Sequence, residues 1–462
     1  DSKIQTPHLD AMIQNGIHFT DAHSGSAVCT PTRYGILTGR YAWRTSMKEG
    51  VTWSWSPPLI DKKRSTVASK LQKKGYHTAC IGKWHLGLGW VKDSLDRVDI
   101  RKALTEGPND NGFDYFFGIT ASLDIPPYIY IENDRSTTQI IDTIEKRGGK
   151  EFWRKGAIGN DFKHIEVLPK ITEKAVEYIS TQATGEKPFF LYFPLPAPHT
   201  PILPSEKFQN QSNTNAYGDF VLMVDDVVGQ IEAAVKAAGI SENTLIIFSS
   251  DNGCSPMADF EELAEVGHDP SYVFRGHKAD IFEGGMRVPF IAKWPASIPS
   301  GISSDEIICH TDLMATLAKI TQDSLLPNEG EDSYDMLAVL RGEKMETPIR
   351  EATVHHSVNG SFSIRQGKWK LIFCPGSGGW SDPRPAKAKE LELPLLQLYD
   401  LTQDIAEENN LIKDHPKLAK KMADVMKSYI ERGRSTPGPD QSNDTETMLY
   451  LHSQVPEDFY FD

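Results

Sequence analysis

The segment from Ser26 to Arg40 reads Ser-Ala-Val-Cys-Thr-Pro-Thr-Arg-Tyr-Gly-Ile-Leu-Thr-Gly-Arg, and the rest of the chain is organised around it. Thr30 is a favourable N-cap, and Pro31 suits the first turn of a helix, where its missing N–H has no cost. Gly39 suits the left-handed position that ends a helix. We therefore expect a two-turn helix with Cys29 at or just before its N-terminus, where backbone N–H groups favour negative charge.

Cys29 and Arg33 together predict a site for a small anion. Arg33 lies about one helical turn after Cys29, so both side chains can point the same way. A cysteine by itself is most often a small buried hydrophobe. A sulfur nucleophile precursor beside a fixed cation is more informative than either residue alone.

Composition narrows the class of protein. The chain has 462 residues, of which 39% are hydrophobic and 24% charged, which is typical of a globular protein long enough for two domains. No apolar run reaches the length that spans a membrane. The net charge of −14 argues against a nucleic-acid partner. The five cysteines show neither paired spacing nor a metal-knuckle pattern.

Short apolar runs alternate with helical patterns through the first three quarters of the chain. This alternation predicts a mostly parallel sheet with helices on both faces. Strands are expected at 17–19, 78–81, 189–193, 245–248 and 288–292, and helices at 66–74, 171–181, 216–238 and 310–320. Residues 90–154 are expected to form long loops near a substrate cleft.

Three polar groups directly follow predicted strands: Lys83 to His85, His199, and Asp251-Asn252. Because ligands bind at the carboxyl edge of such a sheet, we expect the three groups to converge there. Lys83 and His85, spaced by two, can face the same side of an extended segment. The alternative for each is ordinary: Asn252-Gly253 is a favoured turn dipeptide, and a lone Lys or His is usually a solvated surface residue.

The pattern of predicted strands and helices changes after about residue 348. Short strands are expected at 353–356, 361–365, 369–373 and 396–399, followed by one long helix at 415–432. We therefore predict a domain at 1–348 and a small C-terminal α+β domain at 349–462, built on an antiparallel sheet.

Cys29-Thr30-Pro31-Thr32-Arg33 with Leu37-Thr38-Gly39-Arg40 resembles the signature of the formylglycine-dependent type I sulfatases, which belong to the alkaline-phosphatase-like superfamily. Gly82-Lys83-Trp84-His85 and Asp251-Asn252 match further motifs of that family. The resemblance implies an α/β/α sandwich and a sulfuric ester hydrolase that acts on a sulfated carbohydrate or an aryl sulfate. It also implies a maturase that converts Cys29 to Cα-formylglycine, a bound Ca²⁺ with Mg²⁺ as the alternative, and a periplasmic or extracellular location.

The resemblance assigns roles residue by residue. The catalytic set it implies is Cys29, Arg33, Lys83, His85, His199 and Lys278. Asp251, Asn252 and the modified residue 29 would hold the metal, and Lys83, His199 and Lys278 would bind the sulfate. Two alternatives stay open: a phosphomonoester or phosphonate hydrolase of the same superfamily, and a sulfated-glycan binding protein without turnover.

Two further expectations concern the substrate and the metal. Asp124, Tyr128, Arg135 and Trp153 could contact a sugar, with nothing to say which sugar. The family's metal site also uses an Asp-Asp pair at the end of a first strand, and no such strand precedes Cys29 in this sequence. We therefore expect an N-terminally truncated chain with a divalent cation short of ligands and negative charge.

Overall fold

The computed structural model describes residues 3–449 and is an α/β fold with a separate antiparallel sheet. Its first sheet has the order β6-β5-β4-β3-β9. In it, β3 (His77–Lys83) runs parallel to β4 (Tyr115–Ile119) and β9 (Phe189–Tyr192), while β5 (Ile131–Glu132) and β6 (Arg135–Ser136) add antiparallel pairs. Residues 78–83 are all buried, because helices cover both faces of a parallel strand.

The second sheet has the order β10-β11-β1-β12. Its strands are β10 (Ile246–Ser249), β11 (Phe290–Lys293), β1 (Ile17–Phe19) and β12 (Ile302–Ser304). The pairs β10/β11 and β11/β1 are antiparallel and β1/β12 is parallel, so the sheets of the fold mix both kinds of pairing. A short parallel pair, β2 (Ala22–His23) and β13 (Ile308–Cys309), lies between this sheet and the C-terminal one.

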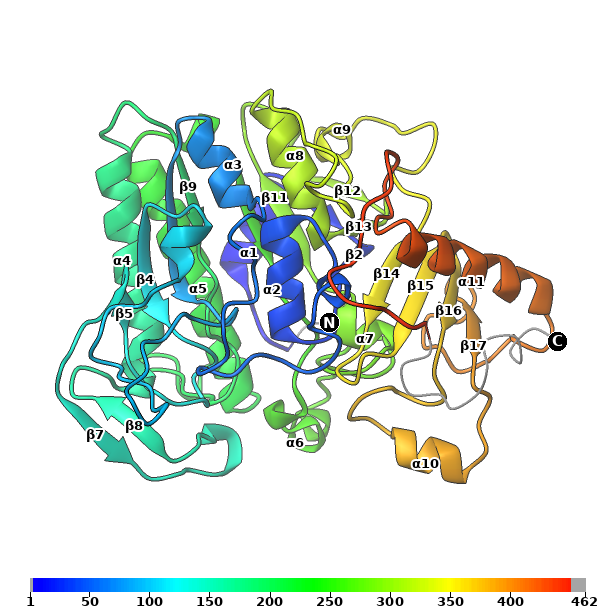
Figure 1. The fold of residues 1–462 in the computed structure, drawn as a ribbon, viewed down its shortest axis with the longest axis horizontal. Coiled ribbons are helices and arrows are strands. Elements are labelled where there is room, and N and C mark those ends of the chain that lie inside the picture. Colours follow the sequence, from blue (N-terminus) through cyan, green and yellow to red (C-terminus); the bar gives the residue numbers. More distant parts are fainter. Residues whose placement is uncertain (1–2, 450–462) are drawn as a thin grey trace.

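Helices cover the strands on two sides (Figure 1). On one side lie α1 (Pro7–Gln14), α4 (Val167–Gln182) and α5 (Ala216–Ala237), and on the other α2 (Cys29–Thr38), α3 (Val67–Lys73) and α8 (Leu313–Ile320). Leu191 of β9 and Ile246 of β10 pack into one cluster with Val235 of α5. The neighbouring edge strands of the two sheets therefore pack against the same helix, α5. This arrangement, with helices on both sides of the strands, confirms the predicted α/β/α architecture.

The expectation of loops across residues 90–154 was wrong for one central element. Tyr115–Ile119 forms β4, a strand in full parallel register with β3. Its aromatic run does not alternate with polar residues, because both of its faces are buried, and a sequence without alternation is hard to recognise as a strand. The remainder of this stretch contains β7 (Ile141–Ile144), which forms a hairpin with β8 (Gly156–Gly159) just beyond residue 154, at the lower left of Figure 1.

The C-terminal sheet confirms the predicted antiparallel strands. It consists of β14 (Thr353–His356), β15 (Phe362–Gln366), β16 (Trp369–Ile372) and β17 (Gln397–Asp400), paired in that order. Across it lies α11 (Pro416–Glu431), which buries a stripe at helical spacing formed by Ala419, Met422, Ala423, Met426 and Tyr429. Four short helices complete the description: α6 (Phe260–Glu265), α7 (Glu283–Met286), α9 (Leu337–Leu340) and α10 (Pro385–Glu390). The division at residue 348 stays a prediction.

Buried arginines fasten α2 to the rest of the molecule. Gly39 ends the helix in the left-handed region, with φ of 64°, as predicted. Beyond it, Arg44 is fully buried and donates to both carboxylate oxygens of Asp332 at 2.8 Å. Arg40 contacts Asp444 on the segment after α11, which returns to the front of α2 in Figure 1. Asp444 is half-exposed, so the fully buried Arg44–Asp332 pair is the stronger constraint on the position of the helix.

Candidate active site

Cys29 is the first residue of α2 and is 2% exposed. The N-cap is Val28, in an extended conformation, so the expectation that Thr30 caps the helix was wrong. Thr30 lies one residue inside the helix, and its hydroxyl donates to the backbone oxygen of His85 at 3.0 Å. The hydroxyl of a threonine in the first turn can hydrogen-bond either to the backbone at the helix end or to a neighbouring loop. Here it bonds to the loop after β3. Cys29 lies at the helix N-terminus, as predicted.

Four cationic or imidazole side chains surround the Cys29 sulfur. Lys278 donates from Nζ to Sγ at 3.7 Å, the side chain of His199 also hydrogen-bonds to the thiol, and the ring of His85 lies beside it with Nδ1 unpartnered. Burial alone would raise the pKa of Cys29, but the charges of Lys278 and Lys83, together with the hydrogen bond from His199, hold it well below its usual value. The site therefore stabilises negative charge at residue 29 strongly enough to overcome desolvation.

Lys83 and His85 reach the pocket from the end of β3, but not along an extended segment. His85 has φ of 59°, so the backbone turns there in the left-handed region. Burial lowers the pKa of Lys83, and it lowers the pKa of His85 to about 4 with Lys83 adding to the effect. His85 is therefore neutral at pH 7, and its Nε2 donates to the backbone oxygen of Thr52 at 2.8 Å. Thr52 also hydrogen-bonds Thr30, a support that sequence reasoning did not identify.

Arg33 links the cysteine helix to the Asp251-Asn252 segment. Its Nε and a terminal nitrogen contact Oδ2 of Asp251 at 3.0 and 2.8 Å, and its other terminal nitrogen donates to the backbone oxygen of Lys83 at 2.8 Å. The side chain of Asn252 leaves Oδ1 buried without a hydrogen-bond partner. An orphaned amide oxygen beside a carboxylate fits part of a Ca²⁺ or Mg²⁺ ligand set. Asp251, Asn252 and residue 29 are thus suited to hold the family's cation.

Besides Thr52, two further residues at this site were not found from the sequence. His310 accepts or donates a 2.6 Å hydrogen bond with the Ser249 hydroxyl and interacts electrostatically with Asp251. Burial lowers the pKa of His310 to about 4, so it is neutral. Tyr192, at the end of β9, hydrogen-bonds Arg33. Both residues stand at strand or helix ends with no motif around them, and only the fold brings them to the site.

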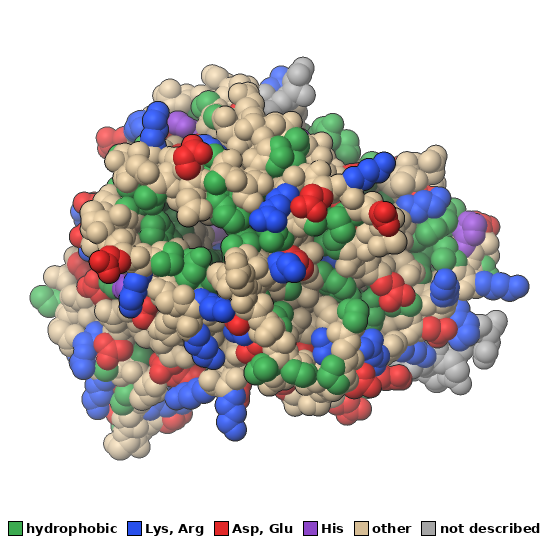
Figure 2. Space-filling model, turned by 90° about the horizontal axis from the view of Figure 1, so that it is seen from above, with side chains coloured by type: hydrophobic (Ala, Val, Ile, Leu, Met, Phe, Trp, Pro, Cys, Tyr) green, Lys and Arg blue, Asp and Glu red, His purple; other side chains and the backbone are tan. Residues whose placement is uncertain are grey.

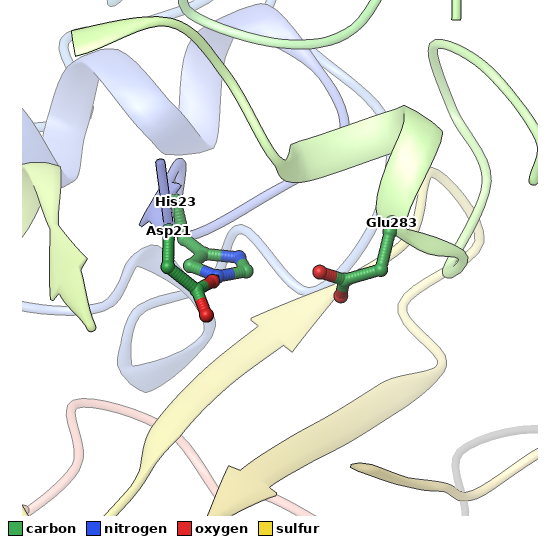
Figure 3. A group of neighbouring side chains, drawn as sticks. All are labelled: Asp21, His23 and Glu283. Atoms are coloured by element: carbon green, nitrogen blue, oxygen red, sulfur yellow. The ribbon is translucent and has the colours of Figure 1, made fainter. Parts of the chain in front are cut away.

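A second group of potential ligands, Asp21, His23 and Glu283, lies deep between β2, α7 and the C-terminal sheet (Figure 3). Arg365 contacts both carboxylates, at 2.7 Å to Asp21 and 3.3 Å to Glu283, and Lys370 contacts Glu283 at 2.9 Å. The carboxylates are already neutralised by these cations. We therefore interpret the group as a buried ion network that joins the two parts of the fold.

The residues expected to contact a sugar separate into two sets. Tyr128 and Trp153 are buried and pack on the ring of His164, so they belong to the core and the expectation was wrong for them. Arg135 is exposed beside Asp134 on a sheet edge. Asp124 alone lies near the pocket, with Oδ1 at 3.9 Å from Nδ1 of His199. Acidic and basic side chains are interspersed over the face in Figure 2, so the positive charge that faces an anion is local to the pocket.

Comparison with known proteins identifies the family. The family model described as Sulfatase matches residues 1–323. This chain belongs to the sulfatase family. It is 30% identical to N-acetylgalactosamine-6-O-sulfatase of Bacteroides thetaiotaomicron, over 93% of this chain and 89% of that protein. It is 29% identical to arylsulfatase A of Homo sapiens, over 88% and 78% of the two chains.

A solved structure supports the same assignment. A protein studied for the metabolism of multiple glycosaminoglycans by Bacteroides thetaiotaomicron superposes with a TM-score of 0.81 and 30% identity, over 92% of this chain and 94% of that one. The sulfatase is thus a sulfuric ester hydrolase of the class that acts on sulfated carbohydrates or aryl sulfates. The family uses a formylglycine and a divalent metal. Within residues 3–449, the helices are all too short or too polar to cross a membrane.

Proposed function

We propose that this sulfatase removes the 6-O-sulfate of an N-acetylgalactosamine residue in a glycosaminoglycan. The observation that carries the proposal is the pocket around residue 29, where two lysines and two histidines stabilise an anion. The choice of sugar rests on relatives named N-acetylgalactosamine-6-sulfatase in Bacteroides thetaiotaomicron and Mus musculus.

Two groups complete the site in the proposed mechanism. A formylglycine at position 29 would supply the attacking hydroxyl, and a maturase would have to make it from Cys29. A divalent cation held by Asp251, Asn252 and residue 29 would polarise that hydroxyl and the sulfate. The unpartnered Oδ1 of Asn252 supports this ligand assignment. We propose Ca²⁺ as the ion, because carboxylate and amide oxygens suit a hard cation.

The chain's own residues bind the sulfate and move protons. Lys83 and Lys278 neutralise the sulfate oxygens, and their burial makes each charge effective because little water screens it. Arg33 holds Asp251 in place, and Asp251 is the acceptor for a proton from the attacking hydroxyl.

His199 is the donor of a proton to the leaving alcohol. Its side chain hydrogen-bonds the residue-29 thiol and is 21% exposed, so it lies between the pocket floor and the entrance. Neutral His85 lies beside Cys29, and its Nδ1 has no hydrogen-bond partner, so Nδ1 is placed to accept a proton when sulfate is expelled.

Sulfate release from matched substrates tests the proposal. The protein would be produced with a formylglycine-generating enzyme and assayed on 6-O-sulfated and 4-O-sulfated N-acetylgalactosamine, on an aryl sulfate and on the corresponding phosphate ester. We expect the 6-O-sulfate to be the best substrate. Faster release from the 4-O-sulfate would refute the choice of position, and faster phosphate release would support the alternative of a phosphomonoester hydrolase. A periplasmic or extracellular location, proposed with the substrate, is testable by cell fractionation.

A further inference from the structure

A carboxylate oxygen beside the sulfate pocket has no partner. Asp124 is 8% exposed, and its Oδ1 is buried without a hydrogen bond, 3.9 Å from Nδ1 of His199. A buried ionised oxygen left unsatisfied is costly, so such an atom calls for an explanation. His199 does not provide it, because its Nδ1 lies 2.7 Å from the backbone oxygen of Thr200. A ligand hydroxyl entering beside His199 would satisfy Asp124.

The other oxygen of Asp124 is fixed by Arg154. The guanidinium of Arg154 contacts Oδ2 of Asp124 and donates to the Asp124 backbone oxygen at 3.1 Å. The backbone N–H of Arg154 donates to the same oxygen at 3.2 Å. Asp124 is therefore held in one orientation, with Oδ1 turned away from its cation. A pre-oriented acceptor loses little entropy when it binds a hydroxyl.

An exposed indole packs against Arg154. The guanidinium carbon of Arg154 is 5.1 Å from the ring centroid of Trp53, and Trp53 is 50% exposed. Single exposed hydrophobic residues are common and need no function. Trp53, however, belongs to a segment in which buried Thr52 and Ser54 alternate with exposed Trp53 and Trp55.

The two buried residues of this segment, Thr52 and Ser54, are hydrogen-bonded to neighbouring segments, and Thr52 is bonded to a residue of the catalytic pocket. Thr52 accepts the hydrogen bond from His85, which itself contacts Cys29. Ser54 accepts from the hydroxyl of Thr120 at 2.9 Å. Because hydrogen bonds fix the two hydroxyl residues, the indole of Trp53 is held at the surface beside Arg154 in a defined position.

We propose that Asp124 and Trp53, with Arg154 as the positioning residue, form the subsite for the sugar ring that carries the sulfate. Oδ1 of Asp124 accepts a hydrogen bond from a ring hydroxyl next to the ester, and the apolar face of the ring packs on Trp53. This rests on the proposed function, because it takes the ligand to be a carbohydrate sulfate. The subsite explains how a pocket that recognises any sulfate discriminates among the alcohols that carry it.

Binding rather than turnover tests the subsite. The titrations use the full chain in a Cys29→Ala background, in which neither hydrolysis nor a thiolate interferes. The ligands are 6-O-sulfo-N-acetylgalactosamine and inorganic sulfate, followed by calorimetry. A hydrogen bond to a charged acceptor corresponds to a loss of about 10- to 100-fold in affinity when it is removed. We expect Asp124→Ala to lower the affinity for the sugar sulfate by at least ~10-fold, and Trp53→Ala to lower it by about 3- to 10-fold.

Titration with inorganic sulfate distinguishes a sugar subsite from a purely structural role of Asp124. If Asp124 acted only by holding His199, its replacement would weaken both ligands equally, and that outcome would overturn the proposal. We expect sulfate affinity to stay the same or to rise in Asp124→Ala, because a nearby negative charge is removed. Trp55→Ala is the matched control: Trp55 is 45% exposed on the same segment but packs on Trp90 at 5.4 Å, away from Arg154. It should bind the monosaccharide like the parent.

The remaining outcomes are also decisive. Equal sugar binding by parent, Asp124→Ala and Trp53→Ala would refute the subsite, as would absence of sugar-sulfate binding by the parent. If the variants lose sugar binding but the matured enzyme with Cys29 restored releases no sulfate, the subsite stands and the proposed function fails.

Discussion

Replacing Lys278 by methionine removes the cation that lies directly on residue 29. Lys278 Nζ is 3.7 Å from Sγ of Cys29 and its side chain is buried. With an effective dielectric constant of about 20, two unit charges at this separation interact by about 4 kcal/mol. Loss of one charge-stabilising donor in an active site typically costs about 100- to 1,000-fold in turnover, which is the same scale. We therefore expect Lys278→Met to lower sulfate release by at least ~100-fold.

The assay compares matured wild type and variant for sulfate release at saturating substrate, with thermal unfolding to show that the fold is retained. Lys207→Met is the control, because the Lys207 side chain is 70% exposed and pairs with Asp226 far along the surface. In unmatured protein, ultraviolet absorbance of the thiolate should show that the pKa of Cys29 rises in the Lys278 variant. Turnover within ~3-fold of wild type, together with an unchanged thiolate titration, would refute our placement of the anion pocket.

Three further predictions concern the modification, the ion network and the cation. Active protein should carry an aldehyde at position 29, and full activity of protein whose peptide mass shows an intact Cys29 thiol would contradict this. Glu283→Gln should lower stability at pH 7, but by less than the about 3–5 kcal/mol expected for a buried charge left without a partner, because Lys370 loses Glu283 and keeps Glu407 at 2.8 Å. Burial would raise the pKa of Glu283, but Lys370 and its neighbours hold it well below its usual value. The stability that Glu283 contributes is therefore fully present above about pH 4.3 and is lost as the pH falls further. Calorimetric unfolding should therefore show the gap to wild type narrowing in acid, and a gap that widens would be inconsistent with this. Asn252→Ala should weaken Ca²⁺ binding in a calorimetric titration, and equal affinities would exclude its Oδ1 as a ligand.

Local patterns in the sequence were sufficient for much of the fold. Gly39 ends α2 because only a residue without Cβ adopts the left-handed region at no cost. The stripe of α11 follows from one face being buried, and strands of the C-terminal sheet such as Phe362–Gln366 alternate apolar and polar residues in sequence although nearly all of their residues are buried. Strand β4 was missed, because a strand buried on both faces has no alternation by which to recognise it.

The candidate site divides in the same way. Cys29, Lys83, His199, Asp251 and Lys278 were proposed from motifs, and the structure brings their side chains together through strand ends that meet at one place. The sequence therefore determined which residue types form the anion pocket.

Only the tertiary structure decided which other residues join them. Thr52, His310 and Arg154 are ordinary in sequence. Asp124, Tyr128 and Trp153 were equal candidates for a sugar contact, and only the structure shows that the two aromatic rings are buried in the core. Whether a polar atom is paired or an aromatic ring is covered depends on contacts between segments far apart in the chain. Asp124 is separated from Arg154 by 30 residues. No local pattern encodes that contact, and only packing brings the two side chains together beside His199.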